Sequence, residues 1–221
     1  MEYTLDEKEA RILGVLIEKQ MTTPDYYPLT LNALVNGCNQ KSSRYPVVNW
    51  SETEVNDALQ RLRTNHLVWQ VKTPGSRVAK FEHNMKEVAD FSTGELGLLC
   101  VLLLRGPQTV GELKTRTVRM VEFHGLAAVE HTLQKLMNHE NGPFVEKRMP
   151  MPGQKESRFA QLFHAGEESV PESDSLAMPV EGPVKDAEAD RVRCLEERVA
   201  SLEAELRELT AAFREFKKQF E

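Results

Sequence analysis

The feature that most limits the fold of this chain is an amphipathic helix followed by a two-stranded hairpin, between Ser51 and His83. Ser51 and Glu54 form a capping box, which starts a helix because each side chain bonds a free backbone N–H. Residues 67–71 and 78–81 alternate as strands do, with turn-forming residues between them. This order predicts the second half of a winged helix-turn-helix domain. Apolar residues share one face of the helix: Val55, Ala58, Leu59 and Leu62.

The same pattern occurs twice, so the sequence indicates a duplication. Residues 59–62 (LQRL) return 74 positions later as 133–136 (LQKL), and a second hairpin is expected from 144–148 and 158–163. Residues 9–23 align with 95–109 at a distance of 86 positions. The two distances differ by 12 residues, and we expect this extra length in the polar loop before Trp50. The predicted domains are residues 1–91 and 92–163.

Capping boxes also predict where other helices begin. They occur at Thr4, Ser92 and Thr109, in addition to Ser51. The Thr4 helix is expected to run to about Gln20, and further helices are expected over 29–37, with Gly37 as C-cap, and over 125–138. The predicted fold class is α+β and mainly helical, with two tandem winged helix-turn-helix domains, a flexible linker and a C-terminal coiled-coil helix.

The last 58 residues depart from this pattern. Residues 164–190 are acidic, rich in Pro and Gly and without periodicity, so they predict a flexible linker. Residues 191–221 carry a heptad seam that a single helix cannot bury, which favours a homodimer over docking onto the body. The seam residues alternate at spacings of three and four: Val192, Leu195, Val199, Leu202, Leu206, Leu209, Phe213, Phe216 and Phe220.

The net charge of −6 comes mainly from the tail. Residues 1–91 hold 11 Lys/Arg and 12 Asp/Glu, residues 92–163 hold 9 and 7, and residues 164–221 hold 8 and 15. The body is therefore nearly neutral, and the acidic total does not exclude nucleic acid. The sequence lacks a signal peptide and a long apolar run, and its three cysteines are widely spaced. These features predict a reduced cytoplasmic protein that does not enter the membrane.

Three segments resemble a known family. They are residues 18–44 (EKQMTTPDYYPLTLNALVNGCNQKSSR), 102–113 (LLLRGPQTVGEL) and 142–146 (GPFVE). Together they resemble the YceH-like family of uncharacterised bacterial proteins, over about residues 4–163. The resemblance implies tandem winged helices with a helical tail, and it implies no activity and no catalytic residues.

The sequence does not predict an enzyme or a bound cofactor. The stretch 106–111 has the glycine spacing of a P-loop, but Glu112 and Leu113 follow where Lys and Ser/Thr would hold phosphate and magnesium. His124, His131 and His139 have no cysteine or clustered carboxylates near them in the sequence, which disfavours a metal site. The cysteines Cys38, Cys100 and Cys194 lack a His–acid setting that would activate a thiol.

A nucleic-acid contact is the candidate function of the two domains. In a winged helix the third helix enters the major groove and the wing contacts the backbone. Polar side chains of the helix that follows Ser51 can read base edges, and basic side chains elsewhere can hold phosphates. The candidate residues are Lys41, Arg44, Asn56, Gln60, Arg63, Lys72, Arg77, Lys114, Arg116, Arg119, Lys147, Arg148, Lys155 and Arg158.

Two functions remain open from the sequence. A dimer could bind duplex DNA as a regulator of transcription or a nucleoid-associated factor, which the basic second wing favours. Alternatively, the tandem domains could form a protein-interaction scaffold resembling chromosome-segregation adaptors, which the mixed charge around Glu52 and Asp57 favours. The sequence leans slightly towards DNA. It identifies neither a target sequence nor a protein partner.

Overall fold

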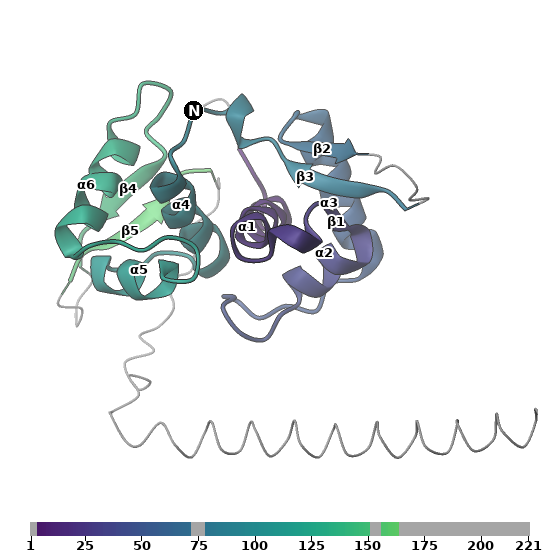
Figure 1. Ribbon diagram of the computed structural model, residues 1–221, viewed down its shortest axis with the longest axis horizontal. Helices are drawn as coiled ribbons and strands as arrows, with labels where there is room; N and C mark the ends of the chain where they lie inside the picture. Colours follow the sequence, from purple (N-terminus) through teal and green to yellow (C-terminus); the bar gives the residue numbers. More distant parts are fainter. Residues whose placement is uncertain (1–3, 72–77, 151–155, 164–221) are drawn as a thin grey trace, which may run out of the picture. The chain divides into compact units, whose positions relative to one another are not determined.

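The computed structural model describes residues 4–71, 78–150 and 156–163 (Figure 1). The described chain is α+β and mainly helical, and the order of three helices and a hairpin occurs twice. The first repeat contains α1 (Glu7–Thr22), η1 (Pro24–Tyr26), β1 (Leu29–Thr30), α2 (Leu31–Cys38), α3 (Glu52–Thr64), β2 (Val68–Val71), β3 (Lys80–His83) and η2 (Met85–Glu87). The second repeat contains α4 (Thr93–Arg105), α5 (Val110–Thr117), α6 (Leu126–Met137), β4 (Val145–Arg148) and β5 (Arg158–Gln161).

Three of the four predicted capping boxes are confirmed, and one is wrong. Ser51, Ser92 and Thr109 cap α3, α4 and α5 as predicted. Helix α1 starts instead at Asp6, whose carboxylate accepts the amide of Glu9 at 2.8 Å while the Glu9 carboxylate accepts the amide of Asp6. The reason lies in long-range pairing, because the residue before the cap donates its amide to the Phe163 carbonyl at 2.6 Å.

Each hairpin gains a third, shorter partner that the sequence did not predict. In the first repeat β3 pairs antiparallel with β2 and also with β1, so that Leu29 faces Phe81. In the second repeat β4 pairs with β5, and Gln108 bridges Phe159 in the position that β1 occupies in the first. The segment before the second helix therefore reaches the hairpin in both repeats, which supports the duplication.

The first helices of the two repeats pack directly against each other. A Cβ at position 14 of α1 would lie only 2.8 Å from Leu104 Cδ2 of α4, so Gly14 permits a close approach. The Cys100 thiol donates to the Gly14 carbonyl at 3.4 Å across the same contact. Both helices are buried along most of their length and join one hydrophobic core. The repeats therefore form a single folded body.

The loop between α2 and α3 is held by a buried arginine of α1. Arg11 is 2% exposed. Its guanidinium donates to the carbonyls of Cys38, Tyr45 and Pro46 at 3.3, 2.9 and 2.8 Å, and it lies over the Trp50 ring. Burial, followed by the nearby Arg44, lowers the pKa of Arg11. Because Tyr45 also donates its amide to the Leu104 carbonyl, this loop joins both repeats.

Two details of the prediction for the first repeat are wrong. The 12 extra residues are not confined to the loop before Trp50, because α1 and its connection to α2 are also longer than their counterparts. Gly37 is not a C-cap but lies buried inside α2, where a Cβ would meet Val15 Cγ1 at 2.6 Å. The predicted linker over 164–190 and the predicted coiled coil over 191–221 lie outside the described residues.

Replacing Arg11 with Leu should lower the free energy of unfolding by about 3 kcal/mol. The substitution leaves three carbonyls without their donor, and each buried group left unpaired costs about 1–3 kcal/mol, partly relieved by apolar packing. Urea unfolding followed by circular dichroism measures the change. The matched control is Arg63→Leu on α3, whose guanidinium bonds only the exposed Gln60 side chain and should cost less than about 1 kcal/mol. Equal losses in both variants would contradict this role of Arg11.

Candidate nucleic-acid interface

The outward face of α3 carries a short chain of hydrogen-bonded polar side chains. The Gln60 amide donates to Asn56 Oδ1 at 3.2 Å, and Arg63 donates to Gln60 Oε1 at 2.6 Å. Gln60 is exposed, and Asn56 and Arg63 are partly exposed, so all three predicted base-reading residues are accessible. Their bonds to each other are at the surface and can be exchanged for bonds to a ligand.

Arg44 is buried, which disfavours its predicted role as a DNA contact. Its side chain is fully buried, and the guanidinium donates to the two carboxylate oxygens of Glu18 at 2.6 and 3.1 Å. It also donates to the Gly37 carbonyl and to Gln40. Lys41, three residues earlier in the same loop, is exposed. The partner that buries Arg44 comes from α1, so no pattern within the loop distinguishes the two residues.

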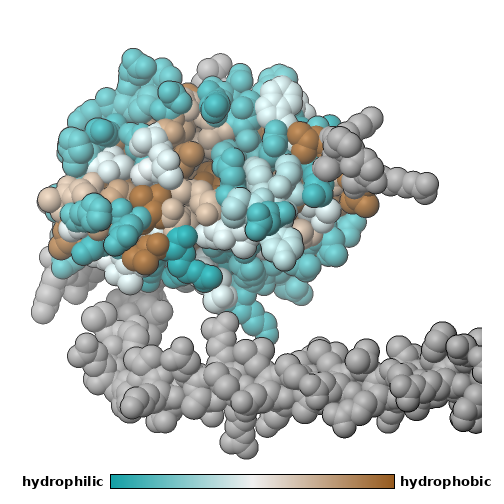
Figure 2. Space-filling model, in the orientation of Figure 1, coloured by the Kyte–Doolittle hydropathy of each residue, from teal (hydrophilic) through white to brown (hydrophobic). Residues whose placement is uncertain are grey.

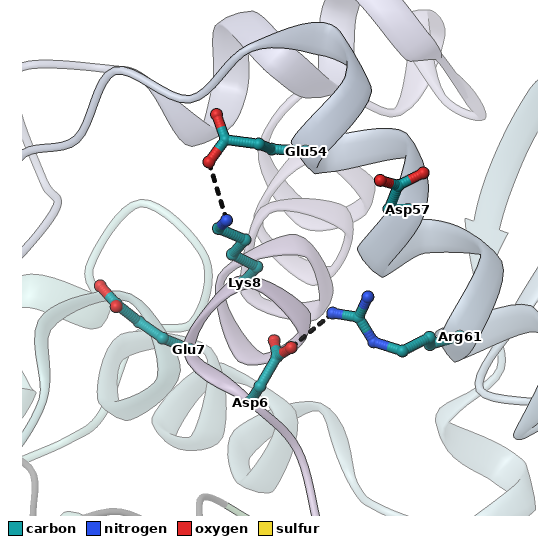
Figure 3. Close-up of a pocket in the computed structure, with 6 residues that line it drawn as sticks. All are labelled: Asp6, Glu7, Lys8, Glu54, Asp57 and Arg61. Atoms are coloured by element: carbon teal, nitrogen blue, oxygen red, sulfur yellow. Dashed lines mark hydrogen bonds and ion pairs between the residues drawn. The ribbon is translucent and has the colours of Figure 1, made fainter.

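A hollow of about 330 Å³ beside α3 is acidic (Figure 3). Lys8 bonds Glu54 at 2.8 Å, and Arg61 pairs with Asp6 and with Glu9. The Lys8 hydrogen bond, followed by those from Ser51, lowers the pKa of Glu54 to about 2. The hollow is lined by more carboxylates than cations, which disfavours phosphate near the start of α3. Its lining residues are Asp6, Glu7, Lys8, Glu54, Asp57 and Arg61.

The second repeat divides its predicted basic residues into paired and unpaired sets. Among the residues that the structure describes, Lys114, Arg119 and Lys147 have no carboxylate partner, and Lys147 lies 6.0 Å from the Phe159 ring centre. The paired residues each contact a nearby carboxylate. Arg116 lies 3.6 Å from Glu112, Arg158 lies 2.9 Å from Glu112, and Arg148 lies 2.7 Å from Glu146.

One basic residue near the predicted site was missed, and three predicted ones cannot be placed. Arg105 ends α4 and donates to Ser43 Oγ of the α2–α3 loop at 2.7 Å. Burial, followed by Arg116 and Arg44, lowers its pKa. Its position after an apolar helix gave no sign of a surface role. Lys72, Arg77 and Lys155 lie outside the described residues.

The described residues include no cluster of metal ligands, and their two cysteines are buried. They contain no group of three His, Cys, Asp or Glu side chains placed to hold a metal ion. Burial raises the pKa of the Cys38 thiol to about 12 and raises that of Cys100 further, so both stay protonated near neutral pH. Within the same residues, no helix has the length and apolar character needed to cross a membrane.

Comparison with known proteins shows which family the chain belongs to. Residues 5–154 match the family described as "Protein of unknown function, DUF480". The chain belongs to this family. It is 47% identical to a "UPF0502 protein" of Solibacter usitatus and 45% identical to one of Pelobacter propionicus, in each case over the whole of both chains. The match to these relatives is consistent with the resemblance found in the sequence.

A second hollow, of about 360 Å³, lies beside the first hairpin of this DUF480 family member and includes Trp69, Phe91 and His83. His83 is held as a neutral ring, because its Nδ1 accepts the Met85 amide at 3.4 Å and its Nε2 lies 2.5 Å from Gln20 Oε1. Burial lowers the pKa of His83 to about 4. Protonation at Nδ1 would replace this acceptor by an N–H that points at the Met85 N–H, so the hydrogen bond would be lost.

Because of His83, the free energy of unfolding of this DUF480 family member should fall in mild acid. Its folded pKa lies below the ordinary 6.5, so its contribution is complete above pH 6.5 and is lost as the pH falls towards 4. The expected loss is about 1–3 kcal/mol, because one pKa unit is worth about 1.4 kcal/mol and the ring is not fully shielded. Urea unfolding at pH 7 and pH 4.5 measures it. The His83→Gln variant should lose less stability between these pH values, and the exposed-residue control His124→Gln should behave as the parent. An unchanged pH dependence in His83→Gln would contradict this assignment.

Proposed function

We propose that this protein is a non-enzymatic tandem winged-helix protein that binds duplex DNA, as a dimeric regulator or nucleoid-associated factor. The repeated order of three helices and an antiparallel hairpin supports the winged-helix description. In that description α3 and α6 are the third helices and the two hairpins are the wings. The heptad seam of residues 192–220 supports the dimer.

The observation that carries this proposal is the set of unpaired basic side chains on the second repeat. Lys114 and Arg119 lie on or just after α5, and Lys147 lies on the strand β4 of the second wing. A cation already held by a carboxylate gains less from a phosphate than one that is free, because the existing pair must be broken. These three side chains are therefore available to contact the phosphates of a nucleic-acid backbone.

A protein-interaction scaffold is the second candidate, and two surface features favour it. The acidic hollow between α1 and α3 suits a basic partner better than a nucleic acid. Apolar side chains gather over the second repeat in Figure 2. Val118, Leu126 and Met149 are 61%, 50% and 81% exposed there, close to α5, α6 and β4. A protein surface could cover these apolar side chains, whereas phosphates would gain nothing from them.

Fluorescence anisotropy with a labelled random-sequence duplex tests DNA binding directly. Phosphate contacts release counterions, so the affinity should fall steeply between about 50 and 200 mM salt. A tract of acidic residues follows the body, and truncation after Gly166 removes it. The truncated chain should bind at least as tightly as the full chain, because it no longer carries a competing polyanion. No binding by either protein at tens of micromolar and the lowest salt, by the same counterion argument, would reject the DNA proposal.

Light scattering tests the proposed dimer. Truncation after Gly166 removes the entire heptad seam, so the mass in solution should fall from that of a dimer to that of a monomer. A milder control is Leu202→Asp with Leu206→Asp, which keeps the full chain length and introduces charges into the seam. A truncated chain that remains a dimer would place the interface in the residues before Gly166.

A further inference from the structure

The structure collects a second, different set of basic side chains where the two repeats meet. We call it the junction cluster and define it as Lys19, Arg44, Arg105, Arg116 and Arg158 around the carboxylates of Glu18 and Glu112. Glu18 contacts Arg44 at 2.6 Å and Lys19 at 3.6 Å. Glu112 contacts Arg158 at 2.9 Å and Arg116 at 3.6 Å. Four cations therefore share two carboxylates, and with Arg105 the cluster holds five cations against two carboxylates.

Arg105 makes no ion pair with a carboxylate among the described residues, although Glu18 and Glu112 lie near enough to favour its charge. Its guanidinium donates instead to the neutral Ser43 hydroxyl at 2.7 Å. Burial lowers the pKa of Arg105 most, and the neighbouring charges of Arg116 and Arg44 lower it further. An anion bound at Arg105 would remove this repulsion. A guanidinium also presents two parallel donors that match the oxygens of a phosphate.

The loop beside Arg105 is already held in one conformation. Ser43 has a left-handed backbone with φ of 61°, which is uncommon for a residue other than glycine. The Ser43 carbonyl accepts a hydrogen bond from the Arg44 guanidinium at 2.9 Å. Tyr45, which follows Arg44, donates its amide to the Leu104 carbonyl. Lys41 and Ser43 are exposed on this loop. A phosphate at Arg105 can therefore also meet the Ser43 hydroxyl, and Lys41 lies two residues earlier on the same loop.

The acidic hollow and the junction cluster lie at opposite ends of α1. Asp6, Glu7 and Lys8 belong to the start of α1, whereas Glu18 and Lys19 belong to its last turns. Glu18 follows Glu7 by 11 residues, which is about 16 Å along the helix at about 1.5 Å per residue. This exceeds the Debye length of about 8–10 Å at physiological salt, so neither group of charges neutralises the other. The described body has one end that repels phosphate and one that attracts it.

We propose that the junction cluster, and not the outward face of α3, binds the phosphate backbone of duplex DNA. This inference rests on the proposed function and names where that function is carried out. Arg105, Arg116, Lys41 and Ser43 make the contact, and Arg44 and Glu18 hold the loop that carries Lys41 and Ser43. Arg116 can take part because it lies as far as 3.6 Å from Glu112, a carboxylate that Arg158 contacts more closely at 2.9 Å. Lys114 and Arg119 add two further unpaired cations on and just after α5.

Salt-dependent anisotropy of the full chain with two matched double variants tests this proposal. Arg105→Gln with Arg116→Gln removes two charges from the junction cluster, and Arg63→Gln with Lys86→Gln removes two charges from α3 and η2. Two lost phosphate contacts should reduce the slope of log K against log salt by about 1.8, at about 0.9 per contact. The junction variant should also bind at least about tenfold more weakly near 0.1 M salt, and the control should bind within about twofold of the parent.

A single variant at an exposed position guards against a loss of folding. Lys41→Gln changes an exposed loop residue, and it should lower the salt slope by about 0.9 with the thermal midpoint unchanged. If the full chain binds DNA while both junction variants retain its affinity and slope, the inference is overturned and the proposed function stands. Weaker DNA binding by the Arg63→Gln, Lys86→Gln variant alone would also overturn the inference and would indicate that α3 makes the contact. No binding by the parent chain would overturn both.

Discussion

The close contact between α1 and α4 is the interaction on which the rest of the structure depends. Each repeat buries one face of its first helix against the other repeat, and Gly14 provides the space for Leu104. Neither helix could leave this contact without exposing a large apolar surface, which the hydrophobic effect opposes. The loop after α2 then joins both repeats through Arg11 and Tyr45. The two repeats behave as one body because of this contact.

That arrangement also decides where charge can collect. A duplicated chain with its first helices together brings the end of α4 beside the loop of the first repeat. Arg105 and Ser43 meet for this reason although they are 62 positions apart. The hollow at the start of α1 arises from a different contact, between α1 and α3, and it gathers carboxylates instead. The fold therefore separates two surfaces of opposite charge in a body whose net charge is small.

The sequence predicted the repeated elements because their signals are local. Ser51 with Glu54 and Ser92 with Glu95 fix helix starts within four residues, and both predictions are confirmed. The Thr4 prediction failed because two overlapping capping patterns compete there, and pairing of Leu5 with Phe163 selects Asp6. The prediction of Gly37 as a C-cap failed for a similar reason, because this glycine allows Val15 of another helix to approach. The candidate site was less predictable: Arg44 and Lys41 look alike in sequence, and only Glu18 from α1 separates a buried side chain from an exposed one.

The bond between Leu5 and Phe163 has a topological consequence. It brings the beginning of the first repeat to the end of the second, so the path of the described chain nearly closes on itself. The order of the repeats along the chain is therefore not imposed by their packing, and a circular permutation that joins these ends would preserve the contact of α1 with α4.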